Sequence, residues 1–106
     1  MSHTKVNYRD VDELAGGLHF MRDALECKQL GFSVFECDPN WKGKRHDHAH
    51  QNHEEVYFLV SGSATLVVEG EEVELEPGDA VRVSPTDTRQ LRTGDEECVF
   101  VVAGAP

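Results

Sequence analysis

The sequence lacks the features that mark membrane-spanning and secreted proteins. No apolar run in its 106 residues approaches the ~20 residues that a membrane-spanning helix needs. The N-terminus, Met1 to Lys5, has no hydrophobic stretch typical of a signal peptide. The cysteines are an odd number without paired spacing (Cys27, Cys37 and Cys98), which argues against a disulfide framework. We therefore expect a cytoplasmic protein that has no membrane partner.

Positive charge is also scarce. Lysine and arginine together number 10 against 20 aspartate and glutamate residues, so the formal net charge is −10. A chain this acidic repels phosphate backbones, and nucleic acid is therefore not an expected partner. The length suits one domain with a single core.

Helical periodicity is nearly absent, whereas short strand patterns fill the chain from residue 30 onward. Runs rich in β-branched and aromatic residues alternate with turn signals such as Asp38-Pro39-Asn40 and Pro77-Gly78-Asp79. The predicted strands are 30–37, 55–60, 64–69, 72–75, 80–83, 89–92 and 98–103. Short strands at this spacing favour an all-β antiparallel sandwich or barrel.

Residues 1–29 carry weaker signals, and we expect them to form strands or an arm that packs on a barrel of residues 30–106. Residues 6–8 and 18–21 have short strand patterns, and Asp10 is suited to cap a turn of helix that runs to Leu14-Ala15.

Two predicted strands, Val56 to Val60 and Val99 to Val102, are apolar on both faces. In a small barrel one face of such a strand is covered by the core, and the other needs a second covering. That covering is either residues 4–29 or another subunit. We expect a homodimer.

Histidines gather in one short stretch. Of the 6 histidines, His46, His48, His50 and His53 precede Glu54, Glu55 and a predicted buried strand. Neutral imidazoles and carboxylates are the usual protein ligands of first-row divalent metals. Because alternate residues of a strand share a face, His48 can point the same way as either His50 or His46. The stretch therefore predicts a metal site.

This stretch resembles the first motif of the cupin superfamily. The motif contains His-x-His, three or four residues, Glu, six residues and Gly, which His48-Ala49-His50, Glu55 and Gly62 match. Gly43 stands one position too close to match the glycine that begins the motif. The resemblance extends over roughly residues 30–103.

The second cupin motif is only half present. The turn Pro77-Gly78-Asp79 agrees with it, but Ser84 and Thr86 replace the later proline and glycine. Arg89 stands where the family has its fourth metal ligand, a histidine. A guanidinium is always charged and has no lone pair to offer, so Arg89 cannot bind a metal in its place.

The resemblance implies a small double-stranded β-helix, or jelly-roll barrel, that is dimeric and holds one divalent metal through His48, His50 and Glu55. The residue pattern also allows a shifted set, in which His46 and His48 act with His53 or Glu55. Two imidazoles and a carboxylate suit Fe, Mn, Ni or Zn.

Two further side chains are candidates for substrate binding. Arg89 either clamps a substrate carboxylate at the cavity mouth or pairs with an acid such as Asp87 at the barrel rim. Tyr57 shares a face with Glu55 and either offers its hydroxyl to the pocket or is a buried aromatic residue.

Three ligands on one face leave coordination positions open, as in catalytic metal sites. The first hypothesis is therefore a metal-dependent enzyme, of dioxygenase or isomerase type, that acts on a small polar or anionic molecule. The alternative is a non-catalytic module that binds a small molecule or the metal.

Overall fold

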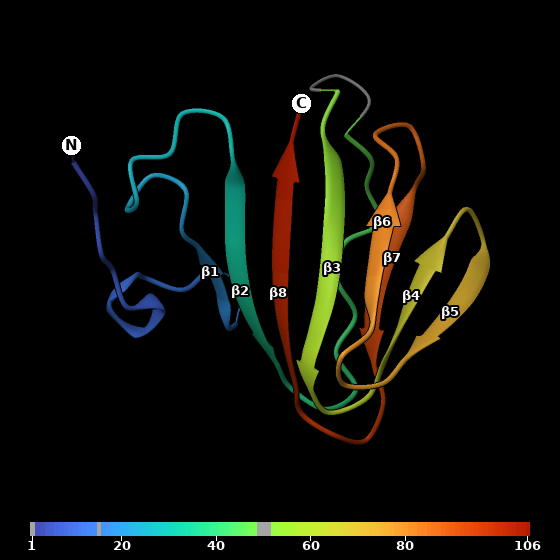
Figure 1. Cartoon of the computed structure of the whole chain (residues 1–106). Helices are drawn as coiled ribbons and strands as arrows, with labels where there is room; N and C mark the ends of the chain where they lie inside the picture. Colours follow the sequence, from blue (N-terminus) through green and yellow to red (C-terminus); the bar gives the residue numbers. More distant parts are fainter. Residues whose placement is uncertain (1, 15, 49–51) are drawn as a thin grey trace.

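The computed structural model describes residues 2–14, 16–48 and 52–106. This part of the chain contains one short 3-10 helix and eight strands, and its strand ladders are all antiparallel (Figure 1). In chain order the elements are η1 (Tyr8–Asp10), β1 (Leu18–Phe20), β2 (Gly31–Cys37), β3 (Glu54–Ser61), β4 (Ala64–Val68), β5 (Glu71–Leu75), β6 (Ala80–Val83), β7 (Arg89–Thr93) and β8 (Cys98–Ala105). No helix in these residues is long and apolar enough to cross a membrane. The predicted all-β fold is confirmed.

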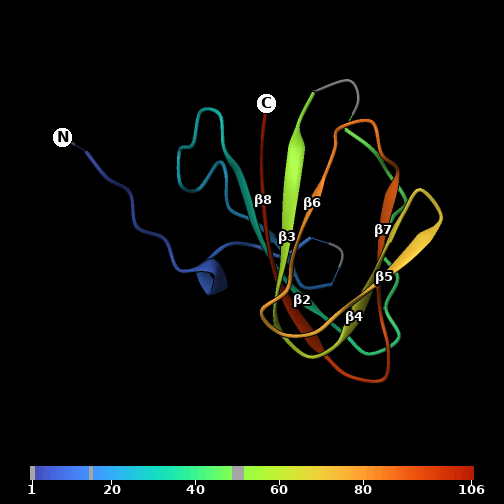
Figure 2. The ribbon, with the colours of Figure 1, turned by 45° about the vertical axis from the view of Figure 1, so that its right-hand side comes forward.

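The strands form two sheets that enclose one core. The larger sheet has the order β1-β2-β8-β3-β6 and the smaller has the order β5-β4-β7, and Figure 2 shows the two sheets facing each other. Side chains from both sheets meet between them, and Leu59, Leu66 and Phe100 are fully buried there. Each comes from a strand that alternates inward and outward residues, as a half-buried strand requires.

The N-terminal residues depart from the sequence predictions. Residues 6–8 form no strand; Tyr8 instead begins η1, and the side chain of Asn7 accepts a hydrogen bond from the Arg9 amide. Leu14 pairs with Leu18 as an isolated bridge and is not part of a helix capped by Asp10, while Ala15 lies outside the described residues. The strand predicted at 18–21 is present as β1.

Two glycines of the cupin-like motifs are explained by their surroundings. Gly62 has a φ of +86°, and a Cβ there would lie 2.1 Å from the carbonyl oxygen of Glu97. Gly78 has a φ of +97° in the turn before β6, where the Asp79 carboxylate accepts a 2.9 Å hydrogen bond from the Glu76 amide. Only glycine adopts these conformations without strain.

The outer face of the larger sheet is covered near β1 and open near β3. Near β1 the N-terminal segment lies over it, where the ring of Tyr8 packs edge-on against the buried His19. On β3, Val56, Phe58 and Val60 are 39%, 40% and 46% exposed. Residues 4–29 therefore leave the outer face of β3 open to solvent in the single chain (Figure 1).

The three cysteines are free thiols. Cys37 and Cys98 are buried and lie opposite each other on β2 and β8. Burial raises the pKa of Cys37 to about 12, so this thiol stays protonated and unreactive at neutral pH.

Truncation of the core should be costly. We expect Leu66→Ala to lower the free energy of unfolding by about 2–5 kcal/mol, because it removes a fully buried side chain between the two sheets and leaves a cavity. Leu30→Ala is the matched control, since Leu30 is 45% exposed. Urea denaturation measures both, and equal losses would contradict this description of the core.

Candidate metal centre

The segment that carries His46 and His48 is held against β7 by backbone hydrogen bonds. The His46 amide donates to the Arg89 carbonyl at 3.0 Å, and the Arg89 amide donates to the His46 carbonyl at 2.8 Å. Two residues later, the His48 amide donates to the Pro85 carbonyl at 2.8 Å. The segment thus extends the smaller sheet beyond β7, and its alternating residues face the barrel interior.

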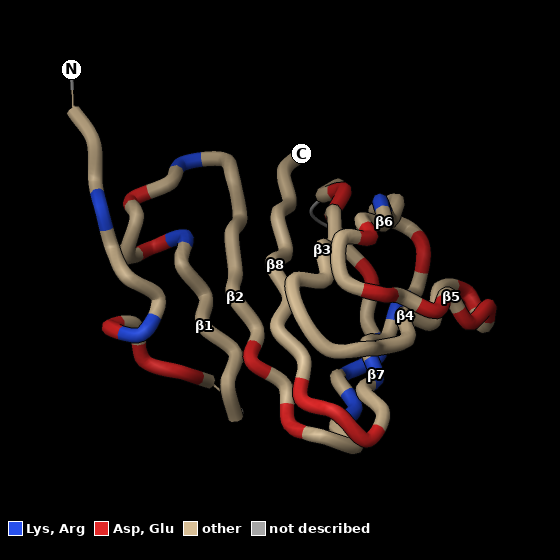
Figure 3. Tube along the Cα trace, turned by 60° about the horizontal axis from the view of Figure 1, so that its bottom comes forward, with Lys and Arg blue, Asp and Glu red and all other residues tan. Residues whose placement is uncertain are grey.

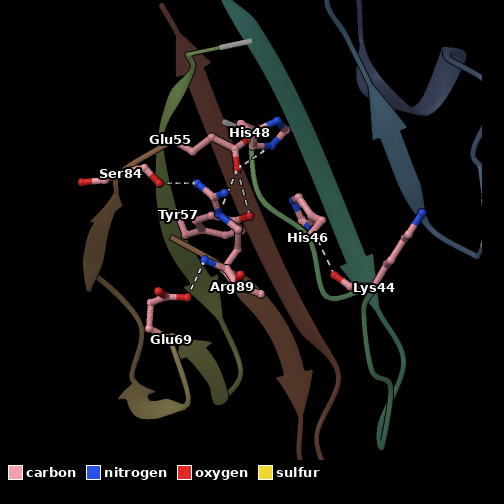
Figure 4. A network of polar contacts seen from close by, with 9 residues as sticks. Lys44, His46, His48, Glu55, Tyr57, Glu69, Ser84 and Arg89 are labelled. Carbon is pink, nitrogen blue, oxygen red and sulfur yellow. Dashed lines mark hydrogen bonds and ion pairs between the residues drawn. The ribbon is translucent and has the colours of Figure 1, made fainter. Parts of the chain in front are cut away.

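Three potential ligands converge at this end of the barrel (Figure 4). His46, His48 and Glu55 each offer one ligand atom, and these atoms lie within 4.8 Å of one another. Two imidazoles and a carboxylate form a donor set suited to a first-row divalent ion. The residues present therefore fit the metal that the sequence predicts.

The described residues include all members of only one of the two predicted ligand sets. The three converging residues are those of the shifted set in which Glu55 is the third ligand. His50 lies outside the described residues. The ring centroid of His53 is 6.3 Å from that of His48. Which set binds a metal stays a prediction.

His46 is oriented by a backbone contact. Its Nδ1 lies 2.9 Å from the carbonyl oxygen of Lys44, and because a carbonyl only accepts hydrogen bonds, Nδ1 carries the proton. In the neutral ring, Nε2 then has the lone pair that a metal needs. Its ring meets that of His48 edge-on, with centroids 5.0 Å apart.

The Glu55 carboxylate is held mainly through one oxygen. Oε1 accepts a 3.0 Å hydrogen bond from the Tyr57 hydroxyl and lies 3.2 Å from His48 Nε2. Opposite Glu55 on β8 is Gly104, where a Cβ would lie 3.0 Å from the Glu55 Cγ. The absence of a side chain at residue 104 leaves room for the carboxylate.

Tyr57 combines both roles that the sequence allows. Its ring is buried in the core, its hydroxyl donates a hydrogen bond to Glu55, and the residue lines the cavity described below. Burial, reinforced by the negative charge of Glu55, raises the pKa of the Tyr57 hydroxyl, so it remains a hydrogen-bond donor in mildly alkaline solution. Its contact with a substrate stays a prediction.

Arg89 lies inside the barrel, beside Glu55. Its side chain has no exposed surface, and its Nε is 3.9 Å from Glu55 Oε1. Its Nη2 donates to the Ser84 carbonyl at 3.2 Å. The described ion pairs join Arg89 to Glu55 and not to Asp87. Arg89 does not line the cavity beside the histidines, and its role as a substrate anchor stays a prediction.

A cavity of about 370 Å³ lies beside the three potential ligands. Its wall is largely apolar, and Trp41, Leu91 and Val102 contribute to it. A second hollow of about 420 Å³ shares His48 and Glu55 with it. These volumes fall within the range of about 300–1,000 Å³ that is typical of small-molecule sites.

Sequence reasoning missed two residues that shape this site. The Lys44 carbonyl orients His46, and Trp41 contributes to the cavity wall and pairs through its backbone with Thr93 on β7. The Asp38-Pro39-Asn40 turn predicted only that a strand ends there. No local signal shows that the following residues run along β7.

Comparison with known proteins decides the family. Residues 33–104 match the family model described as the cupin domain. The chain belongs to the cupin family. A search of curated proteins finds no match.

Solved structures show the same fold as this cupin. A cupin protein from Bacteroides fragilis has 24% sequence identity and a TM-score of 0.74, with 95% of this chain and 86% of that chain covered. KdgF from Halomonas sp. has 18% identity and a TM-score of 0.78, with coverages of 100% and 94%. A protein from Silicibacter pomeroyi described as a sugar phosphate isomerase of the cupin superfamily has 21% identity and a TM-score of 0.78, with coverages of 96% and 75%.

Single substitutions should identify the ligand set. Loss of a residue that only hydrogen-bonds a metal ligand costs about 10–100-fold in metal affinity. We expect His46→Ala, which removes a ligand itself, to cost more than that, and His50→Ala to cost little. Glu55→Gln should weaken binding more than Glu54→Gln, since Glu54 is exposed and points away from the cluster. Calorimetric titration of tag-free protein with Zn²⁺ measures each affinity. A larger loss from His50→Ala would instead favour the set His48, His50 and Glu55.

Proposed function

We propose that this cupin is a divalent-metal-dependent enzyme of isomerase type that acts on a small polar or anionic molecule. The observation that carries the proposal is the convergence of His46, His48 and Glu55 beside a cavity of about 370 Å³. Three protein ligands leave positions on a metal open to a substrate. A bound divalent ion supplies Lewis acidity, which polarises a substrate oxygen.

The protein's own residues supply orientation and exclude water. The Lys44 carbonyl fixes the His46 ring, and the Tyr57 hydroxyl fixes the Glu55 carboxylate. Trp41 and Leu91 form an apolar wall, which strengthens polar interactions inside the cavity. Lys44 also lines the cavity and brings a positive charge to an otherwise acidic chain, which favours an anionic substrate.

Similarity to other cupins supports isomerase over dioxygenase chemistry. The Silicibacter pomeroyi protein is described as a sugar phosphate isomerase, and one from Acidithiobacillus ferrooxidans, with 22% identity and a TM-score of 0.69, as a putative one. A sugar phosphate is both polar and anionic, which agrees with the potential metal ligands and with Lys44 at the cavity. We therefore take sugar phosphates as the first substrate class to test.

One observation favours the alternative, a non-catalytic binding module. Among the described residues lining the 370 Å³ cavity, the only ionisable side chains besides the potential ligands are Lys44 and Tyr57. Tyr57 already donates a hydrogen bond to Glu55, and its raised pKa keeps the hydroxyl protonated, so it is not available as a base. Proton transfer therefore depends on Lys44 or on a ligand residue.

Metal content and turnover test the proposal together. Tag-free protein should carry close to one divalent ion per chain by elemental analysis, and mildly acidic pH should release it because the imidazoles protonate. The loaded protein should interconvert a sugar phosphate, as followed by NMR. Ion uptake without conversion would favour the module instead. A protein that takes up no ion would exclude the metal-dependent enzyme and leave only a module that binds a small molecule.

We also propose that the protein forms a homodimer through the outer face of the larger sheet. Val56, Phe58 and Val60 are exposed there, and neighbouring β8 carries no charged residue along its length (Figure 3). The acids on this face, Glu36 on β2 and Glu54 at the start of β3, lie outside the apolar stretch. In a chain of net charge −10, such a stretch is where two copies meet with least repulsion. The symmetry of such a contact places the same strand on both sides.

A charge placed on this face should separate the dimer. We expect wild-type protein to elute as a dimer in size-exclusion chromatography with light scattering, and Phe58→Asp to elute as a monomer, because each interface would then bury two unpaired carboxylates. Leu14→Asp, at an exposed apolar position near η1, is the control and should stay dimeric. A monomeric wild type would refute the proposed contact.

A further inference from the structure

Arg89 is the most unusual buried group in the described part of the chain. It is the only charged side chain there with no exposed surface, and its Nε and Nη1 have no hydrogen-bond partner. A guanidinium does not lose its proton in proteins, so it carries its charge inside the barrel. Burial of a charge is costly unless another charge offsets it.

The offsetting charge is Glu55. Arg89 Nε lies 3.9 Å from Glu55 Oε1, beyond hydrogen-bond range but close enough for strong attraction in a buried site. Glu55 is also the only carboxylate in the cluster of potential metal ligands. The Glu55 carboxylate therefore offsets the charge of Arg89 and would also bind a metal ion.

The position of Arg89 is fixed by the backbone and by a side-chain contact. It is paired with His46 through two backbone hydrogen bonds, and directly paired residues of an antiparallel ladder carry their side chains on the same face. The guanidinium is further held by its contact with the Ser84 carbonyl. The fold thus fixes a positive charge beside the ligand cluster.

We propose that Arg89 is a built-in counter-cation that shares Glu55 with the metal and lowers the affinity of the site for divalent ions. The inference rests on the proposed metal site. It gives a role to Arg89, which stands where the cupin motif has a histidine ligand. A divalent ion meets repulsion from Arg89 and a carboxylate whose charge is already partly balanced. The site therefore binds a metal less tightly than it would without this charge, and Arg89 acts on the metal through Glu55 and is not a ligand.

Four proteins test this by calorimetric titration with Zn²⁺. Arg89→Met removes the charge and adds no strong ligand, so its affinity should rise about tenfold or more. Arg89→His removes the charge and adds a ligand, so its affinity should rise further. Arg89→Lys keeps the charge and should stay close to wild type. Visible absorption of the Co²⁺ forms should show a change of coordination for Arg89→His alone.

The outcomes separate this inference from the metal site itself. Thermal unfolding first establishes that each variant is folded; if Arg89→Met is not, Arg89→Gln replaces it, since its amide can still donate to the Ser84 carbonyl, and the same rise is expected. A folded neutral variant that binds Zn²⁺ no more tightly than wild type would overturn the role of Arg89 while leaving the site intact. Failure of all variants, Arg89→His included, to bind would overturn the proposed metal site.

Discussion

The Glu55 carboxylate joins the parts of this molecule that determine its chemistry. It lies at the start of β3. Its Oε1 accepts a hydrogen bond from the Tyr57 hydroxyl and lies close to both His48 and Arg89. Room for it exists because residue 104, opposite on β8, is glycine. A buried carboxylate is tolerated only when donors and positive charge surround it. The neighbours of Glu55 provide both.

The sequence predicted the strands well because their signals are local. Alternation of apolar and polar residues and turns such as Pro77-Gly78-Asp79 depend only on near neighbours in the chain. The ligand set was harder to predict, because the position of His46 depends on its pairing with Arg89, more than forty residues away. The same pairing turns Arg89 into the barrel, which no local pattern indicates.

The first thirty residues were poorly predicted for a related reason. His19 is buried because Tyr8 packs on it and the Val11 carbonyl accepts a hydrogen bond from its Nδ1. Tyr8 and Val11 belong to the short helix η1 and its C-cap, for which the sequence carries no periodic signal. The apolar outer face of β3, by contrast, was readable from the run Val56 to Val60, because its residues alternate between core and surface.

The attachment of the histidine segment to β7 has a thermodynamic consequence. His46 is anchored to β7 of the smaller sheet and His48 to the loop before β7, whereas Glu55 belongs to the larger sheet. An ion bound by all three would act as a staple between the sheets, because unfolding would have to break its bonds. Ligand linkage then raises the free energy of unfolding with metal concentration, by about 2.7 kcal/mol at one hundred times the dissociation constant. Metal supply would thus set the stability of the fold as well as occupancy of the site.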